Sequence, residues 1–145
     1  MRHSLRLMSA LSLLFATLAL AACATANVEF IEASKDYDTA ELEILLSTKA
    51  APDLEQRKVE DAPGLRREAL TELRSQSAAG ARAADLITRT FPDVAAVPFH
   101  IEWATFQGDD ALLLIEAAGD SDGSLSSRRL WAIDDQGEVL ISLMR

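Results

Sequence analysis

The sequence predicts an α+β fold: a helix or helix pair packed on a four- to five-stranded antiparallel sheet that ends in a β-meander. Three observations lead to this fold class. Apolar residues recur every three to four positions between 65 and 91, as on one face of a helix. Four segments in the last third of the chain alternate apolar and polar residues, as half-buried strands do. Gly-containing turns join two pairs of these segments, which favours antiparallel neighbours.

The N-terminus has the three parts of an export signal. Its first residues include Arg2 and Arg6 and no acidic residue, and residues 7–20 are apolar or small throughout. Two alanines follow, as a signal-peptidase pocket requires. The apolar run is shorter than the about 20 residues that a membrane-spanning helix needs, which argues against an uncleaved anchor.

The segment Leu20-Ala21-Ala22-Cys23 resembles the bacterial lipobox, the recognition site of prolipoprotein processing. The resemblance implies that the Cys23 thiol receives a diacylglycerol, that cleavage makes Cys23 the mature N-terminus, and that its amine is acylated as well. Two or three acyl chains anchor a protein stably, whereas one chain binds a membrane only reversibly. We therefore expect a lipid-anchored protein of the bacterial cell envelope, held to the membrane through acyl chains on Cys23.

The residue after Cys23 bears on the destination. In Gram-negative lipoproteins an Asp at this place favours the inner membrane, and here the residue is Ala24. The resemblance therefore implies the outer membrane, facing the periplasm, in a Gram-negative cell, and the outer face of the cytoplasmic membrane otherwise. The competing interpretation is an ordinary cleavage site at residues 24–26, which would release a soluble protein that begins at Asn27.

Composition argues against several classes of function. Removal of residues 1–22 takes away two of the 14 basic residues and none of the 23 acidic ones, which leaves a net charge of −11. That charge disfavours binding to nucleic acid or to anionic lipid. Cys23 is the only cysteine, so the chain has no internal disulfide, and acylation would consume its only thiol. The mature chain has one histidine, His100, which excludes zinc sites built on a His pair. We expect no cofactor.

We divide the chain into a signal peptide at 1–22, an acylated N-terminus and tether at 23–36, and a single α+β globular domain at 37–145. Residues 28–31, within the tether, have the composition of a short strand. The export signal and the domain are thus separated by only a short polar and small-residue segment.

Residues 40–47 have two interpretations. Strict alternation of apolar residues favours a strand, whereas the Ala, Glu and Leu content and the capping-box pattern from Asp38 to Glu41 favour a helix. The strand is our leading prediction, because the two glutamates of the segment would then share the solvent side. Residues 50–62 are charged and weakly patterned, so we predict a loop there.

The clearest helical pattern follows. Asp61 can cap a helix, Pro63 suits its first turn, and Pro92 ends the periodic pattern. Gly80 lies in the middle and costs about 1 kcal/mol relative to Ala in a helix interior. The prediction is therefore either one long helix or two helices that meet at 77–80.

The C-terminal strands are predicted at 97–106, 111–118, 127–134 and 138–144. A turn at 107–110 is expected to place Trp103 opposite Leu114, and the last hairpin to place Ile141 and Leu143 on the side of Trp131. Both sides of this sheet are more apolar than a solvent-facing side should be. We expect the helix or helix pair to cover one side, and the N-terminal segment or a partner to cover part of the other. This half-apolar second side is the candidate contact surface for a partner.

Residues 119–123 match the G-x-S-x-G nucleophile elbow letter for letter. The elbow needs a helix after it, and its catalytic His follows later in the chain. Here the next residues lead into a strand, and no His follows Ser121. Counted from Asp120, the spacing also fails as an EF-hand calcium loop. We interpret this segment as a polar turn.

Two other constellations carry potential chemistry. The first and third turns of the meander lie at one end of the sheet and bear four carboxylates that could hold a hard cation, although Asp is also a common turn residue. These candidate metal ligands are Asp109, Asp110, Asp134 and Asp135. His100 and Glu102 lie two apart on one strand, within reach of each other, and could perform acid–base work. Trp103 and Trp131 could stack on a sugar or aromatic ligand, but at alternating strand positions they are typical of a core.

The leading hypothesis is a non-catalytic binding or accessory module, with an envelope protein as partner and without nucleic acid. One alternative is an acid–base or metal-assisted enzyme that uses His100 and Glu102 or the aspartate-rich turns. The other is a purely structural lipoprotein. A pocket that contains His100 beside a perturbed carboxylate would favour the enzyme, and an open apolar face with His100 exposed would favour the binding module.

Overall fold

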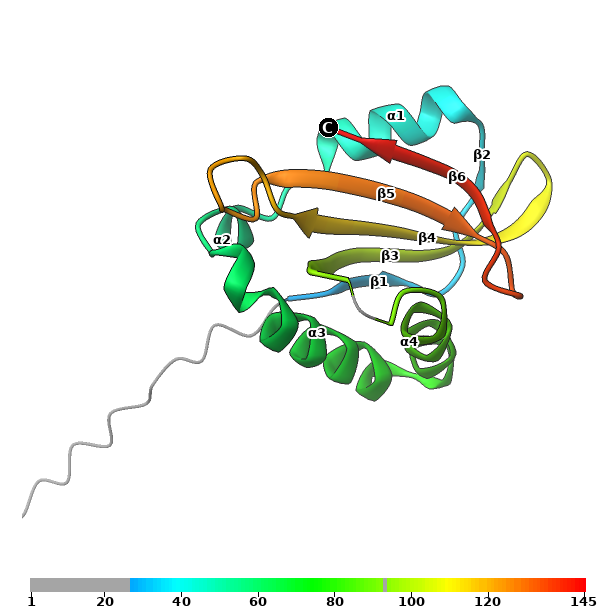
Figure 1. Ribbon diagram of the computed structural model, residues 1–145. Coiled ribbons are helices and arrows are strands. Elements are labelled where there is room, and N and C mark those ends of the chain that lie inside the picture. Colours follow the sequence, from blue (N-terminus) through cyan, green and yellow to red (C-terminus); the bar gives the residue numbers. More distant parts are fainter. Residues whose placement is uncertain (1–26, 93) are drawn as a thin grey trace, which may run out of the picture.

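The computed structural model describes residues 27–92 and 94–145 and has three layers. Helices α3 (Ala62–Gln76) and α4 (Ala78–Thr90) lie on one side of a sheet, and helix α1 (Thr39–Thr48) lies on the other (Figure 1). The predicted α+β class is confirmed. The predicted signal peptide and the lipobox with Cys23 lie outside the described residues, and none of the described helices is both long and apolar enough to cross a bilayer.

The sheet has six strands and mixed direction. The strands are β1 (Glu29–Ile31), β2 (Asp36–Tyr37), β3 (Ala96–Phe106), β4 (Asp109–Ala118), β5 (Ser127–Ile133) and β6 (Val139–Met144). The predicted antiparallel meander is confirmed in β3 to β6. The sheet is larger than the predicted four to five strands, because β1 and β2 both join the other edge of β3, parallel to it. The parallel direction requires the long crossover that the helices supply.

The folded part begins before residue 37. The strand predicted at 28–31 is confirmed as β1, and Val28 just before it is buried. Segment 23–36, predicted as a tether, therefore contributes a strand to the sheet, and the predicted domain start at 37 is too late.

The strand prediction for 40–47 is wrong, because these residues form α1. The capping box decides the local structure: the Glu41 backbone N–H donates to Asp38 Oδ1 at 2.8 Å, and the Asp38 N–H donates to Glu41 Oε2 at 3.0 Å. These two bonds satisfy amides that the first helical turn leaves free. The predicted loop at 50–62 contains a one-turn helix, α2 (Pro52–Glu55), and a short 3-10 helix, η1 (Val59–Asp61).

The prediction of two helices that meet near residue 77 is confirmed. Ser77 has extended backbone and caps α4, since its Oγ accepts the Gly80 N–H at 3.0 Å. Gly80 is buried against the end of α3, and a Cβ built there would overlap the carbonyl oxygen of Leu73. A glycine at this position therefore lets the two helices approach closely.

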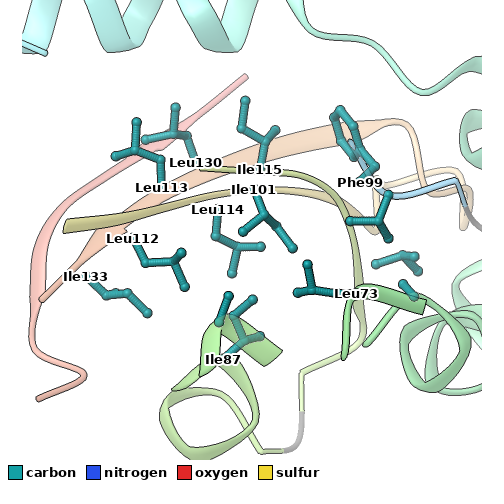
Figure 2. Packing of buried hydrophobic residues seen from close by; sticks show 14 of the residues in the cluster. Leu73, Ile87, Phe99, Ile101, Leu112, Leu113, Leu114, Ile115, Leu130 and Ile133 are labelled. Carbon is teal, nitrogen blue, oxygen red and sulfur yellow. The ribbon is translucent and has the colours of Figure 1, made fainter. Parts of the chain in front are cut away.

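The core lies on both sides of the sheet. On one side, Ile101, Leu112 and Leu114 point toward Leu73 and Ile87 of α3 and α4 (Figure 2). All five side chains are fully buried, so the helix pair covers this side as predicted.

The second side of the sheet is covered as well. Leu113, Ile115 and Leu130 point away from the helix pair (Figure 2) and are fully buried. Helix α1 lies over them and buries its own Leu42 and Leu46. Of the two predicted covers for this side, the N-terminal segment is confirmed. The prediction that the side is an open contact surface for a partner is wrong, because residues 40–47 form a helix, which can cover a sheet.

Two details of register differ from the prediction. The β3–β4 hairpin turns at Gln107 and Gly108, with φ of 53° and 89°, and this two-residue turn places Trp103 opposite Leu112, where Leu114 was predicted. A shift of two residues leaves each side chain on its side of the sheet. In β6, however, Leu140 is an extra residue without a partner in β5. Such a bulge reverses the alternation. As a result, Ile141 lies opposite Ala132 and Leu143 lies opposite Leu130, on the other side of the sheet from Trp131.

The close approach of α3 and α4 leads to a paired prediction. Gly80→Ala should lower the free energy of unfolding by about 1–3 kcal/mol, because the added methyl group overpacks the contact with Leu73. Gly64→Ala is the matched control: it lies in α3 with no atom within 4 Å of a built Cβ, and it should raise stability by up to about 1 kcal/mol through helix propensity. Urea unfolding followed by circular dichroism measures both changes. Equal effects of the two substitutions would contradict the close packing at Gly80.

Candidate functional site

The predicted pair of His100 and Glu102 is brought together on β3. The imidazole Nε2 lies 2.6 Å from Glu102 Oε1, and both residues are buried, with 0% and 1% exposure. They lie on the side of the sheet that α1 covers, since His100 is paired with Ile115 and Glu102 with Leu113. The His100–Glu102 pair is therefore buried inside the domain and is not partly exposed on its surface.

Three further residues complete this network, and all come from the N-terminal segment. Glu29 of β1 places Oε2 2.9 Å from the other ring nitrogen, Nδ1. The Tyr37 hydroxyl of β2 donates to Glu102 Oε2 at 2.8 Å, and the Ser34 and Tyr37 hydroxyl groups are 3.3 Å apart. Sequence reasoning missed these partners, because parallel pairing of β1 and β2 with a strand about 65–70 residues later leaves no local pattern. The only available signal was the predicted strand at 28–31.

The electrostatics of the network favour ionised carboxylates. Burial alone would raise the pKa of Glu102, but hydrogen bonds from His100, Ser34 and Tyr37 outweigh it and lower the pKa from 4.5 to about 2. The hydrogen bond from Lys49, opposed by burial and helped by His100, lowers the pKa of Glu29. Burial raises the pKa of the Tyr37 hydroxyl.

This arrangement limits the acid–base chemistry of His100. Both ring nitrogens are within hydrogen-bond distance of carboxylates, and the ring is fully buried. A general base needs a free nitrogen within hydrogen-bond reach of a substrate proton. The exposed members of the network are Ser34 and Glu29. The Glu29 side chain is 53% exposed and is bound by Lys49 Nζ at 2.8 Å.

A cavity of about 220 Å³ adjoins Glu29 at the end of the sheet where β1 begins. Its apolar wall includes Leu54, Leu65 and Phe99, and its charged residues include Lys49 and Arg57. His100 does not line it. The enzyme hypothesis called for a pocket that contains His100, and this cavity does not contain it. The binding-module hypothesis called for an open apolar face with His100 exposed, and His100 is buried.

A second buried network lies on the opposite side of the sheet. Arg66 of α3 donates from Nη1 to Glu116 Oε1 of β4 at 2.5 Å, and the two side chains are 7% and 0% exposed. The Trp131 indole N–H donates to the other carboxylate oxygen at 3.1 Å. The guanidinium also donates to the carbonyl oxygens of Phe91 and Ala96, at 3.1 and 3.0 Å. Every oxygen of Glu116 is thus occupied from within the domain, which makes this a structural ion pair.

Both tryptophans pack against the core but are only partly buried. Trp131 stacks against Phe91 with ring centroids 4.9 Å apart, and the Arg129 guanidinium lies 5.6 Å from the centroid of its ring. Trp103 donates its indole N–H to the carbonyl oxygen of Ala79 at 3.1 Å, at the start of α4. Trp103 also lines a shallow depression together with Asp110 and Asp135, so packing accounts for only part of its surface.

The aspartate-rich turns do not form a cation site. Asp110 and Asp135 line one shallow depression, but Asp134 accepts the N–H groups of Gln136 and Glu138 within its own turn. Across residues 27–92 and 94–145, no three His, Cys, Asp or Glu side chains are grouped so that they could hold a metal ion. The four aspartates therefore come together only in part, and the Asp134 carboxylate is used within its own turn.

The G-x-S-x-G segment is a polar turn, as interpreted from the sequence. Asp120 and Asp122 accept backbone N–H groups of Ser121 and Ser124 at 2.6 and 2.8 Å. Ser121 is exposed and follows β4, but no helix follows it. The loop is fixed against the η1 segment by the bond from the Val59 N–H to the Gly123 carbonyl oxygen at 2.9 Å.

Comparison of the chain with protein-family models, with curated proteins and with solved structures finds no match in any of the three. The side chains themselves are therefore the basis for a functional interpretation. Of the predicted site residues, only His100 and Glu102 are brought together in a defined geometry. The described residues include a buried His100 with both ring nitrogens at carboxylate oxygens, the Arg66–Glu116 ion pair and a small cavity at Glu29.

The Glu102 network predicts a specific loss of stability in acid. Because the folded-state pKa of Glu102 is lowered from 4.5 to about 2, its contribution is present above pH 4.5 and is lost as the pH falls toward 2. The shift corresponds to about 3 kcal/mol. Urea unfolding between pH 6 and pH 2.5 measures it. Glu102→Gln should be less stable at pH 6 and should show a flatter pH dependence; an unchanged slope would contradict the assignment.

The Arg66–Glu116 pair leads to a second prediction with a control next to it. Arg66→Met should cost about 3–5 kcal/mol, because it leaves the buried Glu116 carboxylate without its partner. Arg67→Met changes the exposed neighbour on the same helix and should stay within about 0.5 kcal/mol of the original protein. Thermal and urea unfolding measure both variants. A cost for Arg66→Met no larger than that for Arg67→Met would show that the pair contributes little.

Proposed function

We propose that this chain is a lipid-anchored protein of the bacterial cell envelope, and that its folded domain acts as a non-catalytic binding or accessory module. The observation that carries the proposal is Leu20-Ala21-Ala22-Cys23, which follows a basic start and an apolar run too short to span a membrane. Acyl chains on Cys23 would supply the membrane attachment that a net charge of −11 does not favour.

The position of β1 supports a domain held close to the membrane. The strand begins at Glu29, and only residues 24–28 separate it from Cys23. Even a fully extended chain of this length spans no more than about 20 Å. An acylated Cys23 would therefore keep the end of the sheet that contains Asn27 near the bilayer surface. The opposite end, with the turns at 107–108 and 134–137, would face away from it.

The non-catalytic interpretation is supported by the chemistry of the described side chains. His100, which the acid–base alternative requires, has both ring nitrogens engaged by carboxylates and is fully buried. The metal-assisted alternative requires the aspartate-rich turns, and those carboxylates do not converge. Helix α1 covers the sheet side that was predicted to contact a partner. A partner must therefore bind exposed residues elsewhere on the domain.

The destination follows from the residue after the anchor. Because Ala24 and not Asp follows Cys23, we propose the outer membrane, facing the periplasm, in a Gram-negative cell. In a cell with a single membrane, the same anchor would hold the domain on the outer face of the cytoplasmic membrane. An envelope protein is the expected partner.

Metabolic labelling with a palmitate analogue tests the anchor. The full chain should incorporate the label and remain in the membrane fraction, and Cys23→Ala should lose both properties because the acyl acceptor is gone. Incorporation that persists in Cys23→Ala would refute the lipobox assignment.

A matched variant distinguishes cleavage at the lipobox from cleavage at the competing site. Ala26→Leu blocks an ordinary signal-peptidase site at residues 24–26 and leaves Leu20 to Cys23 intact. Labelling and processing should be unchanged in Ala26→Leu. If processing instead depends on Ala26 and not on Cys23, the chain is released as a soluble protein and the anchor proposal fails.

A further inference from the structure

We propose that the free edge of β6 pairs with the same edge of a second copy of this chain, in antiparallel orientation, so that the two sheets become one. The inference goes beyond the anchor: the pairing itself needs no acylation of Cys23, and only its enhancement at a membrane rests on the proposed function. It rests on the position of β6 in the sheet, on the exposure of its side chains and on the charges at its two ends.

β6 is an edge strand with unused backbone groups. Within residues 27–92 and 94–145, its only neighbour in the sheet is β5. Arg145 exchanges two backbone hydrogen bonds with Arg128, at 2.8 and 2.9 Å. In an antiparallel ladder such pairs alternate along the strand, so the N–H and C=O groups of Ser142 and Met144 point away from β5. These groups can form a second ladder.

The edge is apolar and has little of the usual protection. Among the described residues, the large hydrophobic side chains with the greatest exposure are Ile44, Val139, Leu140 and Met144, and three of these four belong to β6. From Val139 to Met144 the strand contains neither a charge nor a proline. Soluble proteins usually shield free edges with charged residues, prolines, bulges or very short strands. The one such device in β6 is the bulge at Leu140, which leaves residues 141–144 as a regular strand.

The other edge of the sheet shows the contrast. It is formed by β1 and β2, which have three and two residues and include Glu29 and Asp36. Short charged strands of this kind resist pairing with another chain. The chain thus protects one edge and leaves the other open, which is the expected pattern when the open edge has a partner.

The charges at the ends of β6 select the partner and its direction. Glu138 precedes the strand and Arg145 follows it, and neither takes part in an ion pair among the described residues. Antiparallel pairing of two copies places each Glu138 end beside the Arg145 end of the other copy, whereas parallel pairing would place like charges together. A register centred on Ser142 also brings Met144 of each copy beside Leu140 of the other. A two-fold axis generates both contacts twice.

The expected complex is weak in dilute solution. Six-residue edges alone bury less than the about 1,200 Å² of a standard stable interface. Confinement of two copies to one membrane raises their effective concentration, and the pairing then needs no further contact area. Detection therefore calls for cross-linking in intact cells as well as measurements on the purified full chain.

Thiol cross-linking in cells tests the position of the contact. Ser142→Cys places a thiol at an exposed position of β6, where the two copies of this residue would be adjacent. Ser75→Cys, an exposed serine on α3, is the matched control. A short bifunctional thiol reagent should give a dimer of twice the chain mass with Ser142→Cys and not with Ser75→Cys. Equal yields from the two variants, no product at Ser142→Cys, or a product with a different protein would each overturn the proposal.

Charge and side-chain variants test the antiparallel arrangement. Glu138→Arg and Arg145→Glu should each raise the dissociation constant about tenfold, which corresponds to about 1.4 kcal/mol, and the double reversal should restore it. Met144→Lys should abolish pairing, whereas Ile44→Lys, at a residue of similar exposure on α1 (62% against 70%), should leave it unchanged. Sedimentation of the full chain in mild detergent measures these effects, and circular dichroism confirms folding. Failure of the double reversal to restore association, with folding intact, would exclude the antiparallel pairing.

Discussion

The buried ion pair between Arg66 and Glu116 holds the helix layer to the sheet. A carboxylate on the inner side of β4 is costly unless it is neutralised, and the partner comes from the middle of α3. The same guanidinium binds the carbonyl oxygens of Phe91 and Ala96, which flank the connection from α4 into β3. One side chain thus sets the position of α3, the end of α4 and the start of the longest strand, and Trp131 completes the arrangement from β5.

Buried charges are neutralised in different ways on the two sides of the sheet. On the α3 side, one cation meets one carboxylate and backbone carbonyl oxygens. On the α1 side, His100 lies between Glu102, which is buried, and Glu29, which reaches solvent and binds Lys49. The first network is almost wholly buried, with the Arg66 side chain 7% exposed, and the second ends at the surface with Glu29. A domain without disulfides therefore uses polar networks to specify how both helical layers sit on an apolar core.

Local patterns in the sequence predicted the elements whose structure is decided locally. The four C-terminal strands, the helix break at Ser77 and the polar turn at 119–123 belong to this group. Residues 40–47 were misassigned because alternation and helical composition were both present, and the Asp38–Glu41 capping box settled the outcome. The partners Glu29 and Tyr37 could not be foreseen, since parallel pairing with β3 joins segments far apart in the chain. The bulge at Leu140 likewise has no sequence signal, and it reversed the sides of Ile141 and Leu143.

The parallel pairing of β1 with β3 also orders the events of folding. Glu29 is paired with His100, 71 residues later in the chain, so the first strand to be synthesised cannot be placed until most of the domain has followed it. Contacts of such long range slow folding relative to local ones. The apolar residues of β1 must therefore stay unpaired until β3 is available, and the arrival of β3 is the step that lets the N-terminal segment join the sheet.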